Sequence, residues 1–182
     1  LAEASQLPSP VPEVHEPEVR YPVSERAPTA APLPALIDSD DELRSGLDAV
    51  FGEGAIARFL VPKKIVQSLV VTINSLDGEP VPLRLRPIPH TDGRVLIGSE
   101  GETLTLAPVN DDRYRPFIVA LQAADATQIA DLYLRYYPLF QKAYQDLGYP
   151  NRHFNDRLIR IIDHLLATPE APAPLHLVRA RG

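Results

Sequence analysis

Prolines are concentrated at the start of this chain. Eight of its 20 prolines fall within the first 34 residues, at positions 8, 10, 12, 17, 22, 28, 32 and 34. Each proline lacks a backbone N–H and pushes the preceding residue toward an extended conformation, so neither a helix nor a strand fits this stretch. Its few apolar side chains cannot offset the entropy lost on ordering. We therefore expect residues 1–34 to be a disordered, partly extended spacer and residues 35–182 to form a single domain.

The composition argues against several classes of protein. The chain contains no cysteine, which excludes disulfide bonds, thiol nucleophiles and cysteine-based zinc sites. Its formal net charge of −6 argues against general nucleic-acid binding, which depends on cations that neutralise phosphates. No apolar run approaches the ~20 residues that a membrane helix needs. The sequence has no phosphate-binding glycine loop, nucleophile elbow or metal-ligand spacing, so we predict neither a cofactor nor a metal ion.

Two helices are predicted in the first part of the domain. Ser39 and Glu42 fit a capping box, in which each side chain bonds the backbone N–H of the other residue. An apolar stripe follows, and Gly52 ends this helix. A second helix is predicted to begin near Pro62. Residues 69–73 also have strand propensity, but the apolar spacing and the proline favour a helix.

The second half of the domain is predicted to be helical. Asn110 is expected to cap a short segment. Asp125 is expected to cap a long helix, whose apolar residues recur every three or four positions from 129 to 147. Pro138 falls opposite that stripe and is expected to kink the helix. A last helix is predicted over residues 154–167. Its expected buried residues are Leu158, Ile161, Ile162 and Leu165.

A small sheet completes the predicted fold. Residues 95–97 and 103–106 are predicted to form a hairpin with its turn at 99–101, and residues 175–178 are a candidate third strand. Because two strands are marginal on their own, we expect them to lie on the helices. The predicted fold class is α+β: a predominantly helical single domain with a small antiparallel hairpin or three-stranded sheet, preceded by the disordered proline-rich segment.

One run of residues carries a family resemblance. The sequence YPLFQKAYQDLGYP at 137–150, with FNDRL at 154–158 and IDHLLATP at 162–169, resembles the uncharacterised proteobacterial domain-of-unknown-function family 3014. The resemblance extends over about residues 35–178. It implies no reaction, because no activity is established for that family.

What the resemblance does imply is a cellular setting. Members of the family typically carry one N-terminal membrane helix, a proline-rich spacer and this domain at the periplasmic face of the bacterial inner membrane. The chain begins at Leu1 and contains no methionine, so we expect an N-terminal anchor to be missing. The family's domain normally continues past Gly182, so we expect its C-terminal part to be missing as well.

The last predicted helix carries a cluster of polar residues. At 100° per residue, Arg157, Arg160 and His164 form a basic strip, beside which lie Asp156 and Asp163. Such a strip suits an anionic ligand. The same pattern is typical of a solvated helix face with weak ion pairs, which is the interpretation we favour.

Tyrosines are the second candidate for binding. Tyr133, Tyr137 and Tyr144 fall along one edge of the long helix, and Arg113 and Tyr114 precede that helix in the chain. A groove lined by tyrosines suits a sugar or a peptide, because the ring offers contact area and the hydroxyl a polar group. Core packing with the hydroxyls at the rim explains the same spacing, and we prefer it.

The favoured function is therefore a non-catalytic envelope domain that binds or scaffolds an envelope protein or a cell-wall polymer, with no nucleic-acid partner. Its tentative binding residues are Tyr133, Tyr137, Tyr144, Arg113, Tyr114, Arg157 and His164. The alternative is an envelope hydrolase that uses Asp156, Asp163 or Glu102 together with His164.

Overall fold

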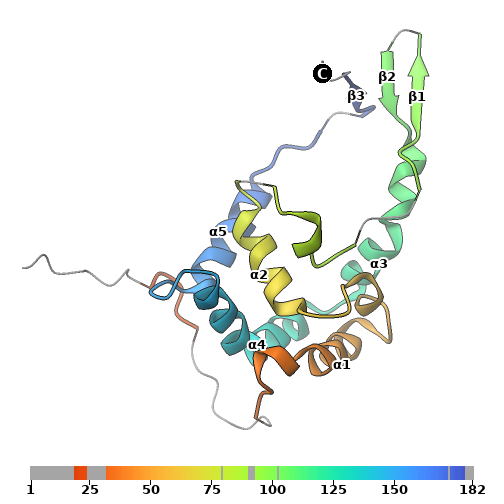
Figure 1. The fold of residues 1–182 in the computed structure, drawn as a ribbon. Coiled ribbons are helices and arrows are strands. Elements are labelled where there is room, and N and C mark those ends of the chain that lie inside the picture. The colour runs from red at the N-terminus through yellow and green to blue at the C-terminus, as the bar shows by residue number, and fades with distance from the viewer. Residues whose placement is uncertain are drawn as a thin grey trace, which may run out of the picture.

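The computed structural model describes residues 19–23, 32–78, 80–89, 93–101, 103–171 and 173–178. Within these residues, five α-helices and a small antiparallel sheet form an α+β fold that is mostly helical, which confirms the predicted fold class (Figure 1). Most of the expected spacer, residues 1–18 and 24–31, lies outside the described residues, as does Glu102.

The helices follow the predicted order along the chain. The α-helices are α1 (Asp40–Phe51), α2 (Ile65–Ser75), α3 (Arg115–Ala123), α4 (Ala126–Asp146) and α5 (Phe154–Leu166). The short 3-10 turns are η1 (Leu36–Asp38), η2 (Ala57–Phe59), η3 (Leu83–Leu85) and η4 (Pro108–Arg113).

Helix α4 is the centre of the fold, and α1, α2 and α5 pack around it (Figure 1). Its predicted cap is confirmed, because the Asp125 carboxylate accepts hydrogen bonds from the N–H groups of Thr127 at 2.8 Å and Gln128 at 3.0 Å. Pro138 lies within the helix and is exposed, so it is directed away from the core as expected.

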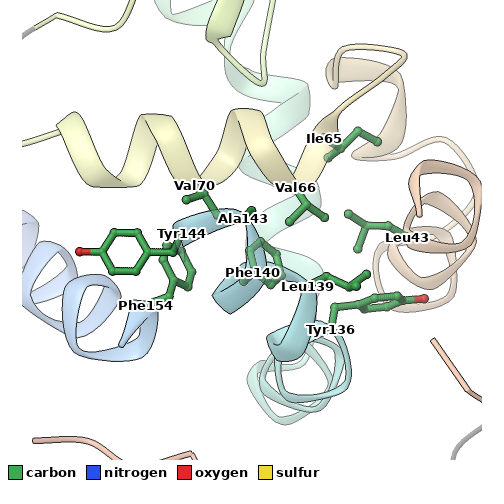
Figure 2. Packing of buried hydrophobic residues seen from close by; sticks show 10 residues of the cluster. All are labelled: Leu43, Ile65, Val66, Val70, Tyr136, Leu139, Phe140, Ala143, Tyr144 and Phe154. Carbon is green, nitrogen blue, oxygen red and sulfur yellow. The ribbon is translucent and has the colours of Figure 1, made fainter. Parts of the chain in front are cut away.

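The core lies between α4 and its three neighbours (Figure 2). Its buried residues are Leu43, Ile65, Val66, Val70, Tyr136, Leu139, Phe140, Ala143, Tyr144 and Phe154. Phe140 of α4 and Phe154 of α5 stack with their ring centroids 5.6 Å apart. Burying a large apolar side chain of this kind contributes about 1.5–3 kcal/mol to stability. The start of α5 is therefore fixed firmly to α4.

The capping box predicted at Ser39 is not formed. Ser39 is fully buried, and its hydroxyl donates to the carbonyl of Leu36 at 2.9 Å. Because η1 runs directly into α1, Ser39 has helical backbone angles and does not adopt the extended geometry of a cap. Glu42 instead forms an ion pair with Arg135 of α4 at 2.6 Å.

Helix α2 begins at Ile65, three residues after Pro62, and the predicted helix is confirmed over residues 69–73. Lys64 before it is left-handed, with φ 59°. The carboxylate of Asp40, at the start of α1, accepts hydrogen bonds from the N–H groups of Lys64 at 2.7 Å and Ile65 at 2.9 Å. The cap of α2 is thus supplied by another helix.

The sheet has the order β1 (Ile97–Glu100), β2 (Thr103–Leu106), β3 (His176–Leu177), so the predicted third strand is confirmed. All its pairings are antiparallel; Ile97 is opposite Leu106, and Leu104 is opposite Leu177. The expectation that the sheet lies on the helices is wrong. Figure 1 shows the sheet beyond α3 and away from the core.

Asn110 explains how the hairpin is held in this position. Its side-chain carbonyl accepts the N–H of Leu96 at 2.9 Å, and its amide donates to the Leu96 carbonyl at 2.7 Å. The expected helix cap at Asn110 is therefore wrong, because this buried side chain pairs with the strand entry.

The end of α5 is less buried than its apolar pattern predicts. Ile161 is buried, but Ile162 is 44% exposed and Leu165 is 52% exposed. Apolar spacing shows which face of a helix is apolar, but it cannot show whether another element covers that face.

Candidate functional site

A short segment, residues 19–23, lies against the first turn of α5 and bends at Arg20 and Tyr21. One carboxylate oxygen of Asp156 accepts the N–H of Tyr21 at 2.8 Å, and the other accepts the N–H of Arg20 at 3.2 Å. The side-chain amide of Asn155 donates to the carbonyl of Tyr21 at 2.9 Å. Two adjacent side chains thus satisfy both main-chain groups of Tyr21. The bend in the segment lets one carboxylate accept two successive N–H groups. We call Asn155 and Asp156 the α5 site.

Helix α4 positions the α5 site through a set of hydrogen bonds. The hydroxyl of Tyr133 donates to the side-chain carbonyl of Asn155 at 2.9 Å. This leaves the Asn155 amide free to point at residue 21. The carboxamide oxygen of Gln141 accepts the N–H of Phe154 at 2.8 Å, and its NH₂ group donates to the carbonyl of Arg152 at 2.8 Å. The turn before α5 and the first residue of α5 are therefore both fixed to α4.

The three predicted tyrosines pack at the interface between α4 and α5. The rings of Tyr133 and Tyr137 meet edge to face with centroids 5.9 Å apart, and Tyr144 stacks on Tyr149 at 4.7 Å. Burial raises the pKa of each of the three hydroxyls above the usual 10.0, most strongly for Tyr133. The Tyr137 hydroxyl donates to Gln141 at 3.2 Å. The rings thus contribute to packing, and the hydroxyls of Tyr133 and Tyr137 support the α5 site.

Arg157 fixes α5 to the end of α2. Its guanidinium donates to both carboxylate oxygens of Asp77, one of them at 2.8 Å, and to the carbonyl of Asn74. The hydrogen bond from Arg157 holds the pKa of Asp77 below its usual 3.8. The Arg157 side chain is only 13% exposed and is bonded within the fold. Arg157 therefore stabilises the packing of α5 on α2 and is not available to a ligand of the basic strip. Arg160 and His164 of that strip are exposed.

Arg113 and Tyr114 do not join this group. They lie at the end of η4, which Figure 1 places on the opposite side of the molecule from α5. The Arg113 guanidinium donates to the carbonyl of Arg94, and Tyr114 is 54% exposed. The structure therefore separates the predicted binding residues. The three tyrosines pack at the α4–α5 interface, Arg157 binds the end of α2, His164 is exposed, and Arg113 and Tyr114 lie beside the hairpin.

The residues of the alternative hydrolase are placed as follows. The Asp156 carboxylate accepts hydrogen bonds from the main-chain N–H groups of residues 20 and 21. Asp163 and His164 are consecutive exposed residues of α5, where neighbours on a helix point about 100° apart. In the described part of the chain, no group of three or more His, Asp or Glu side chains is placed to hold a metal ion. Among the described helices, none combines the length and apolar character needed to cross a bilayer.

The pairing of Asn155 and Asp156 with residues 20–21 was not predicted from the sequence. Locally, Asn-Asp at a helix start is typical of helix capping. The partner segment is 135 residues away from Asp156 and lies within the proline-rich region. Nothing in the local pattern indicates such a contact. One available signal was Tyr21, the single tyrosine of the spacer.

A comparison with family models matches residues 65–182, well over half of the chain, to the family described as "Protein of unknown function (DUF3014)". Asn155 and Asp156 lie within the matched range, whereas residues 19–23 lie outside it. No curated protein and no solved structure matches the chain. On the strength of the family match, the chain belongs to the DUF3014 family of proteins of unknown function.

Proposed function

We propose that this domain is a non-catalytic protein-binding module, and that it binds a short, bent segment of an envelope protein at the start of α5. One observation carries the proposal: Asn155 and Asp156 bind the main-chain N–H and C=O groups of a polypeptide segment. Hydrogen bonds to the main chain of a peptide are a general source of affinity in peptide recognition.

The surroundings of the α5 site support a preformed binding surface. Phe154 is fully buried directly before it, and Asn155 is oriented by the Tyr133 hydroxyl. A side chain that is held in place before binding loses less entropy when the ligand arrives. Asp156 is in the first turn of α5, where the helix dipole favours a carboxylate by about 0.3–1 kcal/mol.

The proposed setting is the periplasmic face of the bacterial inner membrane. Its support is the family resemblance together with the eight prolines of the first 34 residues, which are typical of a spacer between an anchor and a domain. We favour an envelope protein over a cell-wall polymer as the partner, because the groups bound at the α5 site are those of a polypeptide.

Photo-crosslinking in bacterial cells tests the proposal. A photoreactive amino acid at Arg152, an exposed residue just before α5, is introduced into the chain and into an Asn155→Ala/Asp156→Ala variant. We expect a crosslinked envelope protein with the former and its loss with the latter. The matched control is Asn151→Ala/Asp163→Ala, which changes the same residue types at exposed positions and should retain the crosslink.

A parallel assay separates binding from hydrolysis. The purified chain is incubated with peptidoglycan fragments and ester substrates, and products are measured by mass spectrometry. The binding proposal expects no turnover. Turnover that disappears in Asp163→Asn or His164→Gln would contradict it and favour the hydrolase.

A further inference from the structure

We infer that residues 19–23 are a tethered ligand of the α5 site, which must leave before a segment of another protein binds there. The inference rests on the proposed function, because it concerns the regulation of the same site. The contact is therefore autoinhibitory: the chain's own spacer occupies the surface that a partner needs.

The bonds at the α5 site are directed at the main chain. Both carboxylate oxygens of Asp156 and the amide of Asn155 bind backbone groups of Arg20 and Tyr21. The Tyr21 side chain remains 44% exposed. Every polypeptide has these backbone groups, so a partner needs only a segment that bends as residues 20 and 21 do, with two successive free N–H groups followed by a carbonyl. Proline at either of the two positions would prevent binding, because it lacks the N–H.

Residues 19–23 are held more weakly than residues 33–36. Residues 19–22 are exposed and Val23 is only partly buried, whereas Leu33 and Leu36 pack against the core. A contact made of a few exposed hydrogen bonds, with little apolar burial, opens far more readily than a core element. The segment at 19–23 is thus suited to release without unfolding of the domain.

The tether favours the chain's own segment over a competitor. Eight residues, 24–31, join Val23 to the chain that packs on the core. A short tether of this kind gives a local ligand concentration in the millimolar range. A free peptide that makes the same contacts can bind only while residues 19–23 are away from the site. Its apparent affinity is therefore the intrinsic affinity multiplied by the fraction of time for which the site is empty. For an intrinsic Kd of about 0.1 mM, the loss is about tenfold.

The test removes the tethered donors and leaves the α5 site intact. In the full chain, Arg20→Pro/Tyr21→Pro removes both N–H groups that Asp156 accepts. The matched control is Glu13→Pro/Val14→Pro, which also adds two prolines to the spacer but leaves residues 20 and 21 unchanged. The probe is a fluorescent peptide with the sequence of residues 16–25, EPEVRYPVSE, and binding is measured by fluorescence polarisation.

We expect the peptide to bind Arg20→Pro/Tyr21→Pro about tenfold more tightly than it binds the unchanged chain or the control variant. Adding Asp156→Ala to Arg20→Pro/Tyr21→Pro should abolish the gain. Equal affinity for all three chains would overturn the autoinhibition and leave the binding function standing. Absence of binding to a folded Arg20→Pro/Tyr21→Pro chain would overturn the binding function itself.

A second measurement leaves the residues of the α5 site and residues 19–23 unchanged, and so it applies even if the double-proline variant does not fold. A protease recognition sequence is inserted between Arg26 and Ala27, and complete cleavage is verified by mass spectrometry. We expect the N-terminal fragment to dissociate on dilution and to be displaced by the synthetic peptide. Retention of that fragment through dilution and competition would overturn the inference.

Discussion

The N–H of Tyr21 donates to the carboxylate of Asp156 across 2.8 Å, and this bond joins the proline-rich start of the chain to helix α5. The two residues are 135 positions apart in sequence. Together with the bond from Asn155 to the Tyr21 carbonyl, this contact defines the surface to which we assign the binding of polypeptide segments.

Release of residues 19–23 is expected when Asp156 is replaced. Because the chain contains no cysteine, Val23→Cys gives a unique position for a nitroxide spin label. Asp156→Ala removes both acceptors for residues 20 and 21, so the label should become markedly more mobile in its electron paramagnetic resonance spectrum. Asp163→Ala on the same helix should leave the spectrum unchanged. Identical mobility in all three proteins would contradict the contact.

Asp40→Ala should destabilise the domain, because the side chain of Asp40 belongs to α1 but caps the start of α2. The Asp40 carboxylate caps the first N–H groups of α2, and loss of such a cap costs about 1 kcal/mol, up to about 2. The free energy of unfolding, measured in urea, should fall by this amount. Asp41→Ala, one residue later and exposed, is the matched control and should change it by less than about 0.5 kcal/mol. Equal losses in the two variants would contradict a cap supplied by Asp40.

The ion pair of Asp77 with Arg157 should make stability depend on pH in the acid range. The hydrogen bond from Arg157 lowers the pKa of Asp77 in the folded state below 3.8. A carboxyl with a lowered folded pKa stabilises the fold above its unfolded pKa, and this contribution is lost as pH falls through the folded value. The difference in unfolding free energy between the unchanged chain and Asp77→Asn should therefore be constant above about pH 5 and shrink below about pH 4.

In this acid-range measurement, the control is Asp146→Asn, which removes an exposed carboxylate from the surface of α4. Its difference from the unchanged chain should be small across the same pH range. A pH-independent difference for Asp77→Asn would show that the Asp77 carboxylate is not stabilised in the fold.

The buried tyrosines should resist ionisation until the fold opens. Burial raises the pKa of four of the seven tyrosines, namely Tyr133, Tyr136, Tyr137 and Tyr144. A raised folded pKa stabilises the fold below the unfolded value near 10, and this contribution is lost as pH rises through the folded value. After a rapid jump to a pH above 10, ultraviolet absorbance should show a slow tyrosinate phase that coincides with loss of helical circular dichroism.

The chain unfolded in urea is the reference for this measurement, since all its tyrosines should ionise in a single fast phase near pH 10. A fast phase that accounts for all seven tyrosines in the folded chain would contradict the burial of the tyrosines on α4.

Much of the helical part of the fold could be predicted because its signals are local. The Asp125 cap and the apolar spacing along α4 follow from neighbouring residues or simple periodicity, and so does the strand character of residues 176–177. The capping box at Ser39 failed because η1 continues directly into α1. The expected position of the sheet failed because an apolar strand pattern does not indicate which element the strand contacts.

The candidate site was predictable only in part, for a related reason. Sequence spacing placed Tyr133 and Tyr137 on α4, and the structure shows that their hydroxyls bond Asn155 and Gln141. It also grouped Arg157 with a solvated strip, although Arg157 is bonded to Asp77 at the end of α2. Side-chain partners on other elements are set by how the helices pack, which local periodicity does not encode.

By itself, the sequence determined the helical periodicity, the α+β class and the concentration of prolines at the start, because each depends on residues close together in the chain. The hairpin turn predicted at 99–101 is wrong, because β1 extends to Glu100. Only the tertiary structure decided that Asp40 caps α2, that Arg157 binds Asp77, and that Asn155 and Asp156 hold residues 20 and 21. Each of these contacts joins groups 25 or more positions apart, and the packing of α4 against its neighbours brings them within hydrogen-bond distance.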